Sequence, residues 1–308
     1  MVGVSDADRW PPLPLDEWEE SKQTLHRFAQ IAGKVRLQLA PYRNHWWNVT
    51  LRVTTRGLTT TPMPTGDGRS VAIDFDFIDH LVIVSTSAGE RRSFGPAGLS
   101  VAVFHDQLFT ALAEVGVKAS IVEMPFDLEP AIRFSDDRDH AGYDAVYVER
   151  WWSILVQIEQ VFDEFRGRFT GKTSPIQLFW HTFDLAVTRF SGRRAPDRPE
   201  ADRVTREAYS HEVVSFGFWA GDDKVRAPAF YSYTWPDPPN LMQRQLLPEA
   251  AFWDDSGGSA MALLMYDDLR QLASPAESLL AFLQSAYDAG ATAGGWDMEE
   301  LAARPAQS

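Results

Sequence analysis

The chain reads as amphipathic helices separated by short segments of alternating polar and apolar residues. Apolar side chains recur at helical spacing from Asp16 to Ala32, and Gly33 follows as a natural helix C-cap. Polar and apolar residues then alternate from Asn44 to Val53, which predicts a strand.

The second half of the chain repeats this order. The pattern from Trp151 to Phe169 predicts a helix, and alternation from Phe179 to Val187 predicts a strand. The pairs Gly33-Lys34 and Gly171-Lys172 fall at matching places, and so do His45 and His181. Internal repeats of this kind define the architecture of a chain.

The later elements repeat as well. The strand predicted for Ile73 to Ile78 corresponds to one predicted for Val214 to Trp219. A closing helix is predicted from Ser100 to Val115 in the first half. Its counterpart begins at Ser274, with a capping box and a proline at the first helical position, and continues to Gly290.

These patterns predict an α+β protein with an internally duplicated helix–antiparallel-sheet–helix unit and two halves related by a pseudo-twofold axis. We expect residues 1–125 to form the first unit, 126–144 a connecting segment and 145–300 the second unit. Residues 301–308 form a frayed tail in this division. Chance similarity between two ordinary α+β units is the alternative explanation.

Composition narrows the possible functions. The 308 residues are 44% hydrophobic, which excludes a disordered chain, and the absence of cysteine excludes disulfides and thiolate sites. A net charge of −14 argues against a nucleic-acid partner or an anionic membrane surface. No apolar run approaches the ~20 residues of a membrane span, and the start of the chain has no secretory signal pattern, so we expect a cytoplasmic protein. The sequence gives no oligomeric state.

Two histidines are the leading candidates for chemistry. In the predicted strands, His45 shares a face with Trp47 and Val49, and His181 shares one with Phe183 and Leu185. A pseudo-twofold axis could bring both imidazoles to one cavity, where they would suit metal binding or proton transfer. The alternative is a pair of inherited core histidines, each hydrogen-bonded to a carbonyl group.

Several acidic and imidazole side chains are possible partners. Asp184, His211 and Glu212 follow in the second half, although adjacent His211 and Glu212 would point to opposite faces of a strand. A weaker candidate is the run that contains Asp74, Asp76 and His80, whose alternation is also typical of a half-exposed strand. No glycine-rich phosphate loop, zinc-protease motif or nucleophile elbow is present.

Several motifs together carry a family resemblance. They are Trp10-Pro11-Pro12-Leu13-Pro14-Leu15, Asn44-His45-Trp46-Trp47, Phe75-Asp76-Phe77 with Asp79-His80, Ser174-Pro175 with Phe179-Trp180-His181, and Ser210-His211-Glu212 with Phe216 to Asp222. The chain resembles, over nearly its whole length, a bacterial family of uncharacterised proteins catalogued as a domain of unknown function (DUF5996). The resemblance implies a single full-length unit and brings no activity or cofactor.

The leading hypothesis is a small-molecule enzyme, metal-assisted or using histidine acid/base chemistry, with its site between the two halves. Its candidate catalytic residues are His45, His181, Asp184, His211 and Glu212. The candidate ligands of a divalent metal ion are His45, His181, His211 and Glu212. The alternatives are a non-catalytic ligand-binding protein with an aromatic cavity and an interaction scaffold that presents exposed tryptophans.

Overall fold

The computed structural model describes residues 9–303 and contains two antiparallel sheets. The first sheet has, in spatial order, β1 (Arg52–Thr54), β2 (Gly57–Thr59), β4 (Ser70–Asp76), β5 (Leu81–Thr86) and β6 (Arg91–Phe94), and β3 (Met63–Pro64) also pairs with β4. The second sheet has the order β11 (Phe252–Asp254), β12 (Met261–Met265), β10 (Ala229–Trp235), β9 (His211–Trp219), β8 (Asp184–Arg194) and β7 (Gln177–Phe179).

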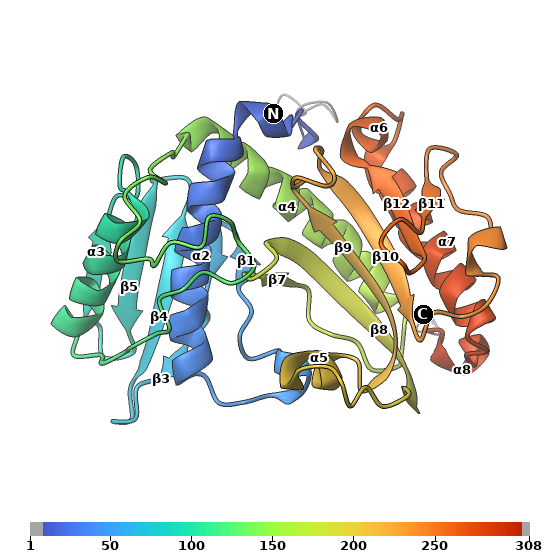
Figure 1. Cartoon of the computed structure of the whole chain (residues 1–308), viewed down its shortest axis with the longest axis horizontal. Coiled ribbons are helices and arrows are strands. Elements are labelled where there is room, and N and C mark those ends of the chain that lie inside the picture. The colour runs from blue at the N-terminus through green and yellow to red at the C-terminus, as the bar shows by residue number, and fades with distance from the viewer. Residues whose placement is uncertain (1–8, 304–308) are drawn as a thin grey trace, which may run out of the picture.

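The two sheets meet at the centre of the molecule (Figure 1). Leu51 and Leu178 exchange two backbone hydrogen bonds of 2.9 and 3.0 Å as an antiparallel bridge. From this bridge the strands run outward in both directions, nearly in chain order. The layout therefore fits a duplicated unit with the bridge near its pseudo-twofold axis.

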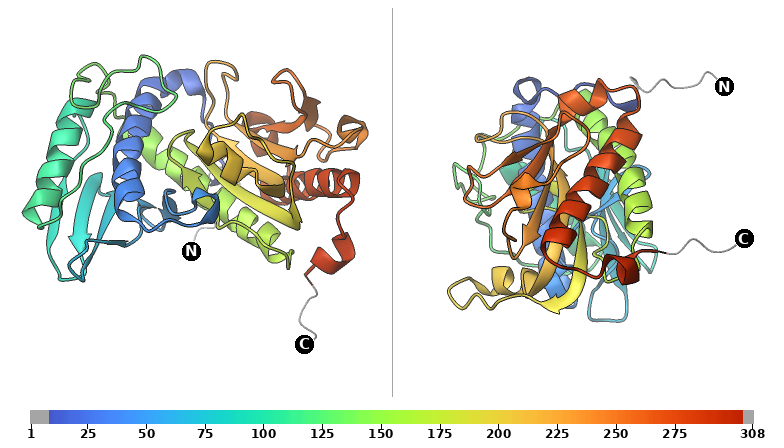
Figure 2. Two further views of the ribbon diagram at one scale, coloured as in Figure 1. Left: turned by 60° about the horizontal axis from the view of Figure 1, so that its bottom comes forward. Right: turned by 90° about the vertical axis from the view of Figure 1, so that its right-hand side faces the viewer.

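Four long helices cover the sheets. They are α2 (Glu19–Leu39), α3 (Val101–Glu114), α4 (Ala145–Gly167) and α7 (Pro275–Ala293). The shorter helices are η1 (Leu15–Glu17), η2 (Asn44–Trp46), α5 (Arg203–Ala208), η3 (Leu241–Gln243), α6 (Tyr266–Arg270) and α8 (Met298–Leu301). Figures 1 and 2 show α2 in front of the first sheet, and α4 and α7 on the far side of the second.

The buried faces follow the alternation of the strands. On β4, Phe75 points toward the helices and stacks on Phe104 of α3, which also stacks on Phe28 of α2 at 3.9 Å between ring centroids. On β9, Phe216 meets Phe165 of α4 edge-on at 4.8 Å. Burial of these large rings is the main stabilising term of each half.

Trp180 connects α2 to the junction of the sheets. Its indole packs directly on Gly33, and its Nε1–H donates to the carbonyl of Val49 at 2.8 Å. Nearby, the ring of Phe183 lies between His26 of α2 (4.8 Å) and Trp151 of α4 (4.7 Å). The junction is thus held from both sides by one helix of each half.

Two glycines that the sequence marks as helix ends lie inside helices. The prediction that the first helix ends at Gly33 is wrong, because α2 continues to Leu39. A Cβ on Gly33 would approach the Trp180 ring to 2.2 Å, and one on Gly290 would approach Thr234 Oγ1 to the same distance. These glycines permit close packing and do not cap their helices.

The predicted first residues of α3 and α7 agree with the structure, unlike the predicted end of α2. Ser100 caps α3 by accepting from the Val103 N–H, and Pro275 occupies the first position of α7. Ser274, however, makes no side-chain capping hydrogen bond, so the predicted capping box does not form.

The two strands predicted around the histidines are wrong in part. Residues 44–46 form the 3₁₀ helix η2, and the strand is confined to 52–54. His45 and Trp46 have φ angles of 56° and 59°, a left-handed conformation that alternation cannot anticipate. Residues 180–183 form a turn between β7 and β8, with Phe183 at φ 61°. Neither histidine therefore lies in a strand.

The connecting segment is anchored by a buried ion pair. Asp137, fully buried, accepts from His140 Nδ1 at 2.8 Å and lies 3.4 Å from the buried Arg27 Nε. Backbone carbonyls of Asp137 and His140 accept from the first N–H groups of α3. The segment thus joins α2 to the start of α3.

The predicted α+β fold is confirmed, whereas the duplication and the division at 126–144 remain predictions. In particular, α4 also packs on the first half, because Trp152 donates to the carbonyl of Thr54 at 3.0 Å. Within residues 9–303, no helix is long and apolar enough to cross a membrane.

The Gly33 contact gives the first testable prediction. Gly33→Ala should lower the free energy of unfolding by about 1–3 kcal/mol, because the new methyl group overlaps an indole that is fixed by its hydrogen bond to Val49. Gly167→Ala is the matched control, since its Cβ meets nothing within 4 Å and a helical alanine is favoured over glycine. Urea denaturation measures both, and equal stability of the two variants would contradict the packing role of Gly33.

Candidate functional site

One face of the second sheet is not covered by the long helices α4 and α7, and only the short helices η2 and α5 reach its lower end. The helices α4 and α7 cover the face that carries Val214, Phe216 and Phe218, where Gly290 of α7 meets Val214. The opposite face, here called the open face, carries every other residue of three adjacent strands. These residues are Asp184, Ala186, Thr188 and Phe190 of β8, His211, Val213, Ser215, Gly217 and Trp219 of β9, and Tyr231, Tyr233 and Trp235 of β10.

The open face combines aromatic rings with small and polar side chains. Tyr231 lies across Gly217, where a Cβ would be 2.3 Å from the phenol oxygen, and its hydroxyl donates to Asp184 Oδ2 at 2.5 Å. Tyr233 stacks parallel to Tyr231 at 6.1 Å. The small residue at 217 is therefore what allows a tyrosine to reach the carboxyl group.

A second aromatic group lies at the lower end of this strip. The Tyr209 hydroxyl donates to the Tyr233 hydroxyl at 3.1 Å, and the Arg198 guanidinium lies 4.6 Å from the Trp235 ring. No acceptor among residues 9–303 reaches the buried indole N–H groups of Trp219 and Trp235. Such donors are normally paired, so these two buried N–H groups are unusual.

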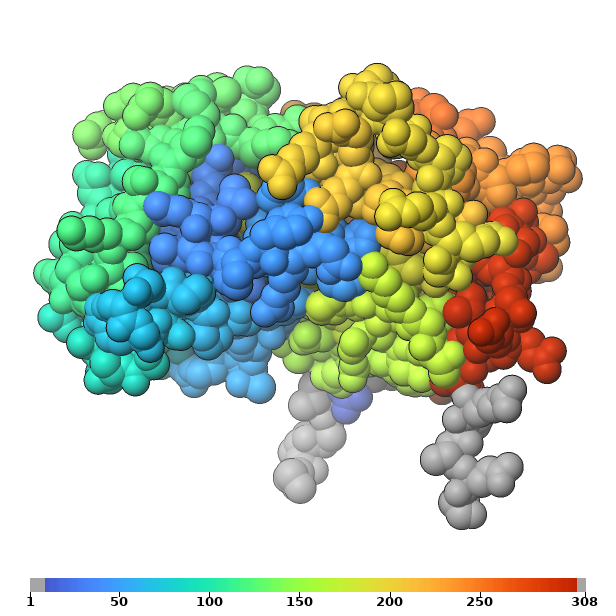
Figure 3. Space-filling model, turned by 90° about the horizontal axis from the view of Figure 1, so that it is seen from below, coloured from blue at the N-terminus to red at the C-terminus, as the bar shows by residue number. Residues whose placement is uncertain are grey.

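His45 reaches this lower end from the first half of the chain. Its backbone N–H donates to Glu207 Oε1 at 3.1 Å, and its ring Nδ1 lies 3.1 Å from the Glu207 carbonyl oxygen. Its ring also contacts Phe190 at 4.8 Å and His211 at 5.6 Å. Figure 3 shows the two segments involved, η2 in blue and α5 in yellow, side by side on the lower face.

Lys172 completes the cluster. It follows α4, its backbone carbonyl accepts from the Phe190 N–H, and its ammonium lies 2.6 Å from His45 Nε2. The ammonium also lies over the rings of Phe190 (4.7 Å) and Trp47 (5.4 Å). No carboxylate among residues 9–303 lies within ion-pair distance of it, and the lysine residue as a whole is exposed, so its remaining N–H donors are accessible from solvent. We refer to Lys172, His45 and His211 as the lysine–histidine cluster.

The hydrogen bonds fix the tautomer of His45. A carbonyl oxygen only accepts, so Nδ1 carries the proton and Nε2 accepts from Lys172. Burial, followed by the positive charge of Lys172, lowers the pKa of His45 to about 4. Burial also lowers the pKa of Lys172 and, with Lys172 and Arg194, that of His211. At neutral pH the cluster therefore presents neutral imidazoles beside a lysine that loses its proton more readily than usual.

The structure separates the five candidate catalytic residues. His45 and His211 lie together, but Glu212 points away from His211 and binds Arg193 and Ser191. Asp184 lies at the other end of β8, where its charge acts on His181. Phe190, the neighbour of His45, lies six positions after Asp184 along the strand, which corresponds to about 20 Å. His45 and His181 therefore do not share a cavity.

The structure also does not bring the four candidate metal ligands together: His45 and His211 are neighbours, whereas His181 and Glu212 lie apart from them. Within the described residues, no group of three or more histidine, aspartate or glutamate side chains could hold a metal ion. The weaker candidate is also accounted for: Asp76 accepts from Arg56 at 2.6 Å and from two backbone N–H groups that end β4, while His80 contacts Tyr143.

Sequence reasoning missed Lys172 and the tyrosines of the open face. Lys172 has no motif, and only the tertiary fold brings it to His45. The tyrosines do have a signal, because Tyr231-Ser232-Tyr233-Thr234-Trp235 alternates aromatic and small polar residues. That pattern predicts a strand with one aromatic face.

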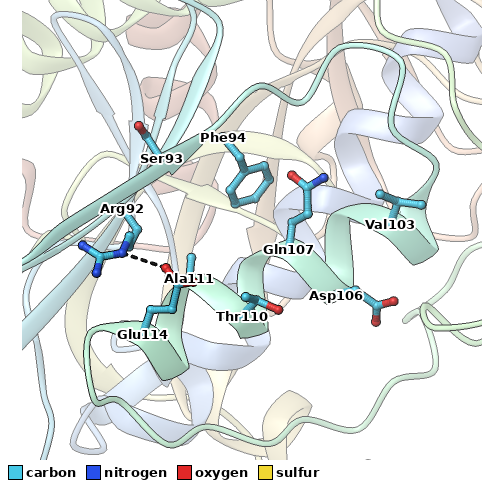
Figure 4. A pocket seen from close by; sticks show the side chains of 9 residues that line it. All are labelled: Arg92, Ser93, Phe94, Val103, Asp106, Gln107, Thr110, Ala111 and Glu114. Carbon is cyan, nitrogen blue, oxygen red and sulfur yellow. Dashed lines mark hydrogen bonds and ion pairs between the residues drawn. The ribbon is translucent and has the colours of Figure 1, made fainter.

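A shallow groove of about 280 Å³ lies elsewhere, between β6 and α3 (Figure 4). The ion pair between Arg92 and Glu114 closes one side, and Phe94 forms its floor. Both charged residues are about half exposed, and the groove brings no histidine or lysine together. The groove therefore has fewer side chains suited to proton transfer than the open face.

Comparison with known proteins agrees with the motif resemblance. The model of a family described as a family of unknown function (DUF5996) matches residues 10–303. No curated protein and no solved structure is significantly similar to the chain.

The electrostatics of His45 give the second prediction. Because its folded-state pKa of about 4 lies below the ordinary value near 6.5, the unfolded chain binds the proton first as the pH falls. The contribution of neutral His45 to stability is therefore complete above pH 6.5 and is lost as the pH falls toward 4. In an NMR titration of the imidazole signals, the His45 signal should not shift between pH 8 and pH 5. A midpoint above pH 6 would contradict the assigned environment.

Proposed function

We propose that this chain, which belongs to a family of unknown function (DUF5996), is a small-molecule enzyme that uses acid/base chemistry at the lysine–histidine cluster. The observation that supports it is the 2.6 Å contact between Lys172 Nζ and the unprotonated Nε2 of His45. The substrate would lie on the aromatic rings of the open face next to the cluster.

The cluster is suited to proton transfer because its geometry does not depend on the proton. Lys172 can donate to His45 Nε2 both as an ammonium and as a neutral amine, so the contact survives when Lys172 gives up or takes a proton. Partial desolvation lowers the pKa of Lys172, which makes its amine a more available base than that of an ordinary lysine. His211, 5.6 Å from His45 between ring centroids, is a second acid or base.

The lysine–histidine cluster also favours a substrate with a negative or carbonyl oxygen. Lys172 has free N–H donors, and the positive charges of Lys172 and Arg194 both act on His211. Taken with the net charge of −14, this local positive charge points to a small anion or polar carbonyl compound. The proposal assigns no metal ion, and it takes the protein to be a bacterial cytoplasmic protein with no nucleic-acid partner.

A non-catalytic ligand-binding protein is the second candidate. The stacked Tyr231 and Tyr233 and the unpaired indole N–H of Trp219 favour it, because a flat ligand could stack there without any reaction. A retained ligand that the protein never converts would support this reading.

The third prediction tests the enzyme directly. Small molecules that raise the melting temperature are selected first, and their conversion is then followed by NMR. Lys172→Met, which keeps the aliphatic stem over Phe190, should reduce turnover of a converted compound by about 10²–10⁴-fold. Lys118→Met removes an exposed lysine in the first half and should leave turnover unchanged.

The lowered pKa of Lys172, on which the proposed function depends, can be measured without a substrate. The chain has five lysines, Lys22, Lys34, Lys118, Lys172 and Lys224, so lysine-selective isotope labelling resolves each ammonium signal. The pKa of Lys172 should lie below the ordinary value near 10.4, because desolvation disfavours its charged form. An ordinary pKa together with unchanged turnover in Lys172→Met would refute the proposed function.

A further inference from the structure

Asp184 is a buried carboxyl group without a basic partner. Its side chain is 8% exposed, and its oxygens accept from the hydroxyls of Thr182 and Tyr231. Within residues 9–303, no nitrogen of an arginine, lysine or histidine lies within 4 Å of it. Buried carboxylates are normally matched by a cation, so the missing positive charge is the feature to explain.

Aromatic residues flank this carboxyl group. Trp219 lies directly opposite Asp184 in the register of β8 and β9, and its ring is 5.3 Å from that of Tyr231. Gly217 leaves the space in which the Tyr231 ring lies flat against the sheet. Electron-rich ring faces beside a carboxylate are the combination that recognises ammonium groups.

The neighbouring histidine does not supply the positive charge. Burial lowers the pKa of His181 despite the opposing effects of Asp184 and Asp127, so His181 is neutral at pH 7. Its ring instead contacts Phe126 of the connecting segment edge-on at 5.6 Å. Asp127 and Asp184 are thus the acidic residues that act on the neutral His181 at this end of the open face.

We propose that Asp184, Trp219 and Tyr231 form a binding site for an organic ammonium group, either primary or methylated. A divalent metal ion fits less well, because it requires about six oxygen ligands and this site offers one carboxylate beside aromatic rings. The site lies about 20 Å from the lysine–histidine cluster along β8 and stands on its own residues, so it does not depend on the proposed enzyme function.

The test uses tetramethylammonium chloride as the probe on the full-length protein. The indole N–H signal of Trp219, assigned through Trp219→Phe, is followed by NMR during the titration at constant ionic strength. A saturable shift is expected with tetramethylammonium and not with tert-butanol, which has nearly the same shape and no charge. No saturable shift, or an equal one with tert-butanol, would overturn the proposal.

Two aspartate variants test whether the carboxyl group of Asp184 binds the probe. Asp184→Asn keeps the size and an acceptor for Tyr231 and should weaken binding roughly tenfold or more. Asp268→Asn makes the same change on the exposed surface of α6 and should bind like the unaltered protein. Unchanged affinity in Asp184→Asn would refute the role of Asp184. Lys172→Met should also bind the probe normally, so failure here and failure of the lysine–histidine cluster are separate results.

Discussion

The contact between Gly33 and the Trp180 indole is the constraint on which the rest of the molecule depends. It lets α2 approach the junction of the sheets so closely that the indole N–H reaches the Val49 carbonyl. Thr50 is held to Gln177 beside it, so residues 44–50 are fixed against the second half. The same segment carries His45, which hydrogen bonds to Glu207 hold in position and whose ring lies beside Lys172.

The long helices and the strand of Val214–Trp219 could be predicted, because their apolar periodicity is a local property of the sequence. What could not be predicted depends on contacts between distant segments. His45 and Trp46 adopt a left-handed conformation inside an alternating run, stabilised by Glu207 from the other half. The strand parity that pairs His45 with His181 in the sequence therefore does not exist in the structure. No pattern in the sequence around Lys172 indicates that it lies beside His45.

The open face differs from the helix-covered face of the same sheet in how its charge is arranged. Lys172 and Arg198 lie at one end, Asp184 and Asp127 at the other, and stacked tyrosines fill the distance between them. The helix-covered face of the same strands carries mainly phenylalanine and valine, together with the buried Arg189. One set of strands thus carries a packed apolar layer on one side and aromatic and polar side chains on the other, and Gly217 leaves the space that the Tyr231 ring occupies.

The contacts at the junction of the two sheets affect the order in which parts of the protein can fold. Trp180 lies 131 positions after Val49, so a growing chain exposes α2 and β1 long before their partners leave the ribosome. Contacts of such sequence separation slow folding, since a long loop must close before they form. The junction therefore forms late in folding, and His45 reaches Lys172 only at that stage.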